Sequence, residues 1–140
     1  PDAHPIENAL ADNIVAGVPA QVTERVSRVR EAVPGIALRS HFHNTRNTGL
    51  ANAFAAVQAG VRTLDASLGG IGGCPFAPAA TGNIPTEDLV YMLQRSGYET
   101  GISLDCAIET GKWLQQQLGR PVPGMLVKAG GFPRPAAQLA

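Results

Sequence analysis

The sequence predicts an α/β fold in which helices cover a parallel sheet. Short apolar stretches with the character of strands alternate with stretches whose apolar residues recur at helical spacing, an order typical of βα units. With 140 residues, 44% of them hydrophobic, the chain has enough apolar side chains for one globular core. Three strands with their helices make either about half of a (β/α)8 barrel, which typically needs ~250 residues, or a short open α/β sheet, and periodicity does not separate the two.

The first predicted strand, the helix after it and the second strand follow one another closely. Residues 9–15 (ALADNIV) form the first strand, and Pro19 lies near the first position of the helix. The chain leaves this helix at the Pro-Gly pair at 34–35 and enters the second strand at residues 36–43 (IALRSHFH). The helix is expected to bury one stripe of valines, namely Val22, Val26, Val29 and Val33.

A second helix, a third strand and a long loop come next. Apolar residues at helical spacing predict a helix over residues 50–60, which a glycine ends, and residues 61–68 (VRTLDASL) read as the third strand. Residues 69–83 (GGIGGCPFAPAATGN) are too rich in Gly and Pro for a regular element. A loop of this length in a compact domain is usually functional or disordered.

The last third of the chain is predicted to be helical and then irregular. Thr86 is expected to cap a helix in which Glu87 and Asp88 complement the dipole of the first turn. Another helix runs from Ser103 to Gly119, and the proline-rich chain from about residue 121 is expected to be an irregular tail of the same partial domain, residues 1–140.

Charge and cysteine usage exclude several classes of protein. Eleven basic and eleven acidic residues give a net charge of zero, which argues against a nucleic-acid partner. Two cysteines without a CxxC pair argue against a disulfide-stapled secreted domain, so we expect a cytoplasmic protein. No apolar run approaches the length of a membrane helix, and no signal peptide is recognisable. Because the sequence lacks an initiator Met, we expect an incomplete gene product, and a mitochondrial matrix location follows if a targeting segment is lost.

Two histidines stand at the end of the second predicted strand. Residues i and i+2 of a strand point to the same face, so His41 and His43 project together and can converge on one cation. The carboxyl ends of parallel strands are where α/β folds place their sites. The alternative is a pair of solvated or hydrogen-bonded histidines.

The two cysteines differ in their expected surroundings. Cys74 lies in the Gly-rich loop, where glycines let the backbone approach a ligand closely, and is either a reactive thiol or an inert buried one. Cys106 lies next to apolar residues of a predicted helix and is expected to be a small core residue.

Several other polar residues are candidates for the same site. Asn83 offers an oxygen ligand for Mg²⁺ or Mn²⁺, or is only a turn residue. Asp12 is either an active-site carboxylate or a cap for the next turn, and Asp65 requires a partner in a salt bridge or a site. Asn44 and Arg46, just beyond the histidines, contact either substrate or water.

Three motifs together resemble a known family. The run HFHNTRNTG at residues 41–49, the GGCP loop and the segment PTEDLVYML at 85–93 occur in this order. From about Leu10 to Pro133 the sequence resembles the C-terminal half of the 3-hydroxy-3-methylglutaryl-CoA (HMG-CoA) lyases, metal-dependent carbon–carbon lyases built on a TIM barrel. The resemblance implies that this chain is the C-terminal half of such a barrel.

The resemblance also implies roles for individual residues. His41, His43 and Asn83 match the ligands of a divalent cation, usually Mg²⁺ or Mn²⁺, and Cys74 matches a catalytic cysteine. Asp12 matches an acidic active-site residue. The family usually has Thr after this Asp, where the present chain has Asn13, whose amide can still donate and accept hydrogen bonds. No segment matches the family's first strand, which supplies an Arg and the fourth metal ligand.

The activity that the resemblance implies is cleavage of HMG-CoA to acetyl-CoA and acetoacetate, as in leucine degradation and ketone-body formation, by an acyl-CoA-binding homodimer. Two other interpretations remain open. One is a lyase for a longer 3-hydroxyglutaryl-CoA or a related aldolase. The other is a noncatalytic half-barrel that binds a metal or an acyl-CoA.

We predict that Cys74→Ala abolishes turnover and leaves metal binding nearly intact, because the thiol is expected to transfer a proton rather than to hold the cation. Cleavage of the acyl-CoA and binding of Mn²⁺ are measured on the same preparation. Equal loss of both would show that the cysteine is structural.

Overall fold

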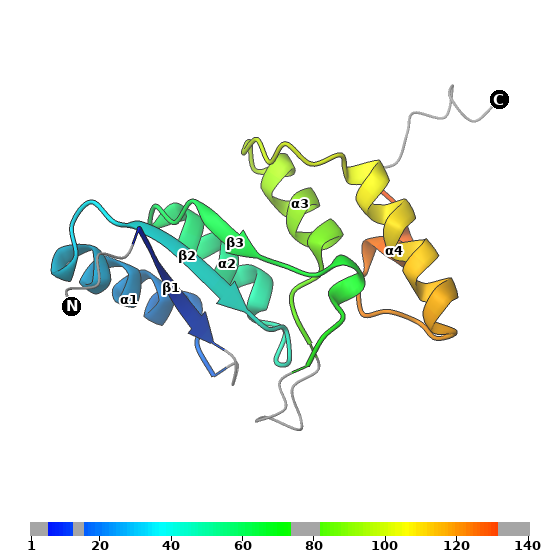
Figure 1. Cartoon of the computed structure of the whole chain (residues 1–140), viewed down its shortest axis with the longest axis horizontal. Helices are drawn as coiled ribbons and strands as arrows, with labels where there is room; N and C mark the ends of the chain where they lie inside the picture. The colour runs from blue at the N-terminus through cyan, green and yellow to red at the C-terminus, as the bar shows by residue number, and fades with distance from the viewer. Residues whose placement is uncertain (1–5, 13–15, 74–81, 132–140) are drawn as a thin grey trace. The chain divides into compact units, whose positions relative to one another are not determined.

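The computed structural model describes residues 6–12, 16–73 and 82–131, which form two compact units (Figure 1). The first unit takes in the chain up to Ser67 and Gly72–Ile84, and the second takes in Leu68–Ile71 and the chain from Pro85 onward. No helix in these described ranges is long and apolar enough to cross a membrane.

A parallel three-stranded sheet forms the centre of the first unit. Its strands are β1 (Glu7–Asp12), β2 (Ala37–Phe42) and β3 (Thr63–Asp65), with β2 in the middle. The alternation of strands and helices therefore produces parallel pairing, as expected for βα units.

The strand limits differ from the expected ones because pairing sets them. β1 begins at Glu7, before the expected start at residue 9, because its pairing with Ala37 begins there; residues 13–15 of the expected strand lie outside the described residues. β3 is shorter than expected. Val61 still donates its N–H to Ala56 O of the preceding helix at 2.9 Å, and the N–H of Ser67 turns away to Ile84 O at 3.1 Å.

Side chains of β2 alternate between two environments. Leu38, Ser40 and Phe42 are buried, whereas Arg39 and His41 are only half-buried on the opposite face. Helices α1 (Pro19–Ala32) and α2 (Gly49–Gln58) lie against the face with the buried residues (Figure 1). The sheet therefore has an apolar face under helices and a second face that carries charged side chains.

The valine stripe of α1 is narrower than the sequence predicts. Val22 and Val26 are buried, while Val29 and Val33 are half-buried. Val33 is not part of the helix but follows its last residue, with its N–H bonded to Val29 O at 2.9 Å. The helix ends at Ala32, before the Pro-Gly pair, and Val33 has a non-helical backbone, so its side chain does not continue the buried stripe.

The second unit is helical. It contains the short 3-10 helix η1 (Leu68–Gly70) and helices α3 (Thr86–Arg95), α4 (Leu104–Leu118) and α5 (Leu126–Ala129). Ser103 caps α4 by accepting the N–H of Cys106 at 3.3 Å, and Gly119 ends it in the left-handed conformation with φ 63°. α5 lies within the stretch that was expected to be irregular.

Two expectations for these helices are wrong. Pro85, not Thr86, is the capping residue of α3, because Pro85 keeps an extended backbone and its carbonyl accepts the N–H of Leu89 at 3.0 Å. Cys106 is exposed rather than part of the core, because it lies on the outer side of the first turn of α4 while Ala107 and Ile108 are buried.

Two carboxylates in the first turn of α3 are buried and hold other segments in place. The carboxylate of Glu87 accepts the N–H of Gly69 at 3.0 Å, and that of Asp88 accepts the N–H groups of Met125 and Leu126 at 2.9 and 2.8 Å. Burial raises the pKa of Glu87, while the N–H of Gly69 and its own N–H oppose the rise. A Cβ at Gly124 would overlap Oε1 of Glu87, so the backbone there approaches the carboxyl closely.

We predict that Glu87→Gln removes a pH dependence of stability. The folded protein binds the proton of Glu87 more tightly than the unfolded chain does. The stability from this proton is therefore present below the ordinary pKa of 4.5 and is lost as pH rises through the raised pKa. Gln stays neutral and keeps an acceptor for Gly69. The parent therefore loses stability as pH rises while the variant does not, and the free energy of unfolding of the variant increases relative to that of the parent.

Urea unfolding of the complete protein across pH 4 to 8 measures this difference. Glu109→Gln is the control, because the Glu109 side chain is 70% exposed. A difference between Glu87→Gln and parent that stays constant across this range contradicts the prediction.

Candidate metal centre

The two histidines of the second strand lie together, as their spacing predicts. His41 belongs to β2 and His43 follows directly after it; their ring centroids are 5.0 Å apart and the ring planes meet at 64°. The His43 side chain is buried, and His41 is 27% exposed. Two imidazoles from one strand end are thus close enough to face a common ligand.

Asn83 reaches the same place from a distant part of the sequence. It forms an isolated antiparallel bridge with His43. Backbone hydrogen bonds flank this bridge on both sides. The N–H of Asn44 donates to Gly82 O at 3.0 Å, and the N–H of Ile84 donates to Phe42 O at 3.3 Å. The backbone of the third candidate ligand is therefore beside that of the second. Cys74 lies outside the described residues.

A tight turn fixes the chain after His43. Asn44 Oδ1 accepts the N–H of Gly49 at 3.1 Å, and its amide nitrogen donates to Asn47 Oδ1 at 3.3 Å. A Cβ at Gly49 would lie 2.5 Å from the carbonyl oxygen of His43 and 2.6 Å from Ile84 Cγ2. Asn44 thus shapes the turn, whereas Arg46 is exposed at its tip.

The electrostatics at His43 favour its neutral form. Burial lowers the pKa of His43, the charge of His41 lowers it further, and the charge of Asp12 opposes both. Its Nδ1 is buried and has no hydrogen-bond partner among the described residues. A buried ring nitrogen of this kind needs a partner, and neutral imidazole is the form that binds a cation, so the site fits a divalent metal.

The donor set suits a hard cation with open positions. Two imidazole nitrogens and an amide oxygen are compatible with Mg²⁺ or Mn²⁺ rather than a closed structural zinc site. Within residues 6–12, 16–73 and 82–131, no three His, Cys, Asp or Glu side chains gather around one point.

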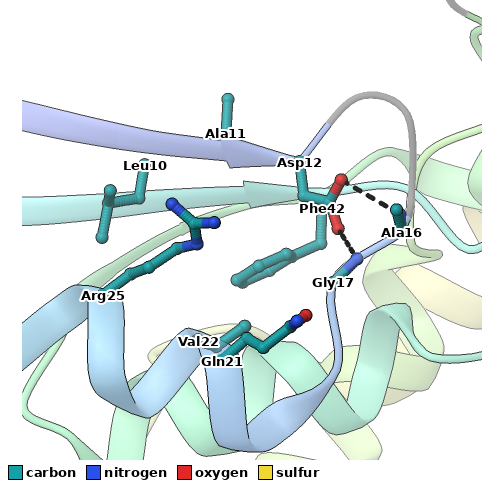
Figure 2. A pocket seen from close by; sticks show the side chains of 9 residues that line it. All are labelled: Leu10, Ala11, Asp12, Ala16, Gly17, Gln21, Val22, Arg25 and Phe42. Carbon is teal, nitrogen blue, oxygen red and sulfur yellow. Dashed lines mark hydrogen bonds between the residues drawn. The ribbon is translucent and has the colours of Figure 1, made fainter.

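Asp12 lies at the rim of a cavity of about 420 Å³ between β1 and α1. Its carboxylate accepts the N–H groups of Ala16 at 3.3 Å and Gly17 at 2.8 Å (Figure 2). Leu10 and Phe42, which share its face of the sheet, also line the cavity. The contact expected of a turn cap is present, and a catalytic role for Asp12 stays a prediction. Asn13 lies outside the described residues.

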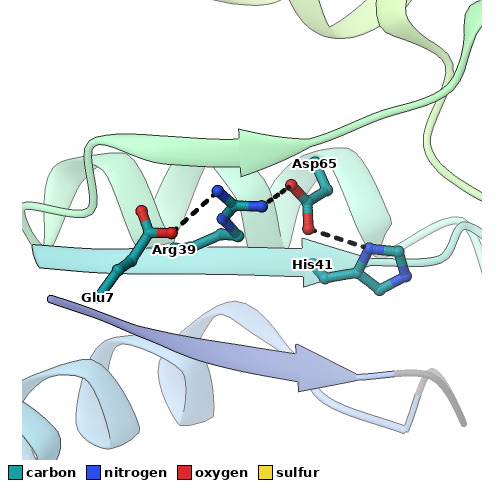
Figure 3. Close-up of polar contacts among 4 residues, drawn as sticks. All are labelled: Glu7, Arg39, His41 and Asp65. Carbon is teal, nitrogen blue, oxygen red and sulfur yellow. Dashed lines mark hydrogen bonds and ion pairs between the residues drawn. The ribbon is translucent and has the colours of Figure 1, made fainter. Parts of the chain in front are cut away.

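A row of charged side chains crosses the other face of the sheet (Figure 3). Arg39 lies 2.9 Å from Glu7 and 3.4 Å from Asp65, and Asp65 lies 3.5 Å from His41. Sequence reasoning named Asp65 without its partners and missed Arg39 and Glu7. The sequence signal that could have found Arg39 is the alternation of strand side chains, because Arg39 lies two residues before His41 and therefore on the same face.

The fold and this donor set define an α/β protein with a candidate divalent-cation site at the carboxyl ends of its parallel strands. A family model described as HMGL-like matches residues 2–113. The chain belongs to the HMGL-like family.

Curated relatives and solved structures agree with this assignment. The chain is 51% identical over 124 residues to the (R)-citramalyl-CoA lyase of Chloroflexus aurantiacus, covering 89% of this chain and 39% of that protein. It is 41% identical to the hydroxymethylglutaryl-CoA lyase YngG of Bacillus subtilis, covering 84% of this chain and 39% of that protein. The chain therefore spans about two fifths of these relatives.

Among solved structures, an HMG-CoA lyase from Acinetobacter baumannii in complex with coenzyme A and 3-methylmalate matches with a TM-score of 0.83 and 46% identity. The match covers 91% of this chain and 43% of that one. These neighbours confirm the expected fold, a part of a TIM barrel with a parallel sheet.

We predict that Gly49→Ala destabilises the protein by about 1–3 kcal/mol, because the new Cβ pushes on the backbone of His43, and that it weakens Mn²⁺ binding. Ala51→Gly, at an exposed position of α2, is the matched control: it costs about 1 kcal/mol of helix stability and leaves Mn²⁺ binding unchanged. Urea unfolding and Mn²⁺ titration measure the two effects. Unchanged Mn²⁺ affinity in Gly49→Ala contradicts the assigned role of the turn.

Proposed function

We propose that the complete protein is a divalent-cation-dependent lyase that cleaves HMG-CoA to acetyl-CoA and acetoacetate. The observation that carries the proposal is the His41–His43 pair at the end of β2 with Asn83 bridged to it, in a chain of the HMGL-like family. Relatives named as lyases of branched acyl-CoA thioesters support the reaction class.

In this proposal His41, His43 and Asn83 hold Mg²⁺ or Mn²⁺. When bound, the cation polarises the hydroxyl and carboxylate oxygens of the substrate and lowers the pKa of the hydroxyl. Burial lowers the pKa of His43 and so favours the neutral imidazole, the form that binds a cation.

The other candidate residues move protons and hold the substrate. The bond between C2 and C3 of the thioester breaks, and its electron pair stays on C2 as an enolate while the tertiary hydroxyl becomes a ketone. We assign Asp12, whose charge acts on His43, to the acid–base chemistry of the hydroxyl proton, and Cys74 to protonation of C2. Asn13 and Arg46 are proposed to contact the substrate, whereas Asn44, also a candidate for this role, is proposed to hold the turn that carries Arg46.

A second candidate substrate is (R)-citramalyl-CoA, which the 51% identity to a citramalyl-CoA lyase favours. This thioester has the same methyl-bearing tertiary alcohol, and its carboxylate arm is shorter by one methylene. One methylene is worth only about 10–200-fold in discrimination, so both thioesters need to be compared directly. A longer 3-hydroxyglutaryl-CoA and a noncatalytic acyl-CoA-binding role are further outcomes of the same test. A homodimer, a cytoplasmic location and a place in leucine degradation or ketone-body formation stay predictions.

We predict that the complete protein releases acetoacetate from HMG-CoA, that EDTA abolishes this activity and that Mn²⁺ or Mg²⁺ restores it. His41→Ala and His43→Ala each lower kcat/KM by more than about 100-fold. Mutation of a residue that only hydrogen-bonds a metal ligand already costs about 10–100-fold in metal affinity or activity, and loss of the ligand itself costs more. The same assay with (R)-citramalyl-CoA detects pyruvate, and the ratio of kcat/KM values identifies the preferred substrate. Absence of cleavage with all of these thioesters overturns the lyase proposal.

A further inference from the structure

The parallel pairing of β2 with β3 brings Asp65 opposite His41. The two residues are register partners, so their side chains leave the same face of the sheet from neighbouring strands. Oδ2 of Asp65 lies 3.5 Å from Nδ1 of His41, within ion-pair distance (Figure 3). Nε2 of His41 is the ring nitrogen on the side away from Asp65.

Arg39 fixes the orientation of this carboxylate. Its guanidinium lies 3.4 Å from Oδ1 of Asp65, so each carboxylate oxygen has its own partner, and Glu7 lies 2.9 Å from the other side of the guanidinium. The side chains are between 28% and 41% exposed. Ion pairs at such exposure contribute little to stability, about 0–1 kcal/mol each. The row of charges therefore orients side chains more than it stabilises the sheet.

The two histidines are held differently. His43 is buried with no hydrogen-bond partner for Nδ1 among the described residues, and its position follows from burial and the turn after it. His41 is more exposed and faces a carboxylate. A carboxylate at Nδ1 selects the tautomer with the proton on Nδ1, orients the ring and leaves the lone pair on Nε2 for a cation.

We propose that Asp65 is the positioning residue of His41: it holds the proton on Nδ1 and aims Nε2 at the divalent cation. This inference rests on the cation site of the proposed function. Arg39 keeps the Asp65 carboxylate in the orientation that does this.

The test uses the complete protein, with Mn²⁺ alone as the probe. Free Mn²⁺ is followed by its electron paramagnetic resonance signal during titration. We expect Asp65→Ala to weaken Mn²⁺ binding by about 10–100-fold and Asp65→Asn, which keeps an acceptor oxygen, to weaken it less. Glu7→Gln is the matched control: it removes a carboxylate from the same row but leaves the Asp65–His41 contact, so affinity should stay at the parent value.

A second readout separates positioning from simple charge attraction. In the metal-free protein, proton–nitrogen NMR correlations of labelled histidine report which ring nitrogen carries the proton, with the His41 signals identified by their absence in His41→Ala. We expect His41 of the parent and of Glu7→Gln to carry its proton on Nδ1, and Asp65→Ala to give a mixture. A proton on Nε2 in the parent, or an unchanged tautomer in Asp65→Ala, overturns the proposal.

The two proposals fail in different ways. If His41→Ala binds Mn²⁺ as tightly as the parent, His41 is not a ligand, and both the cation site and the role of Asp65 are wrong. If His41→Ala loses Mn²⁺ while both Asp65 variants keep parent affinity, only the role of Asp65 is wrong.

Discussion

The pairing of β2 between two parallel neighbours is the constraint on which the first unit depends. It sets His41 opposite Asp65 and Asp12 opposite Phe42, and it brings all three strand ends to one edge. Because side chains alternate along a strand, the same register sends Leu38 and Phe42 under the helices and the charged residues to the other face. A slip of one residue would exchange the two faces, expose the core side chains and separate His41 from Asp65.

Buried polar groups hold together the parts that the sheet does not reach. In the second unit, Glu87 and Asp88 leave water but accept backbone N–H groups from Gly69, Met125 and Leu126, which reduces the cost of burying their charges. Near the histidines, the Asn44 side chain closes the turn into α2 in a comparable way. Side-chain oxygens on short loops and first turns thus replace the hydrogen bonds that irregular backbone would otherwise lack.

The candidate centre joins residues with unequal surroundings. His43 is buried beside Asn83, while His41 lies at the more open edge next to the charged row that ends at Asp65. A ligand in a buried place is held by packing, but a more exposed ring can rotate unless a second group orients it. This difference supports a role for Asp65, oriented by Arg39, in holding His41, since such half-exposed ion pairs contribute little to stability.

The sequence by itself determined the α/β class, the order of the strands and of helices α1 to α4, the placing of His41 and His43 on one face, the start of α4 near Ser103 and the family resemblance. These are properties of local spacing and of motif order, which one chain carries without reference to distant contacts. Tertiary structure alone decided that Asp65 faces His41, that Asn44 serves its own turn, and that Glu87 and Asp88 bind distant backbone groups. It also left Cys106 exposed. The physical reason is that strand register, and the loops that reach a given side chain, depend on how separate elements pack, and no local pattern records this packing.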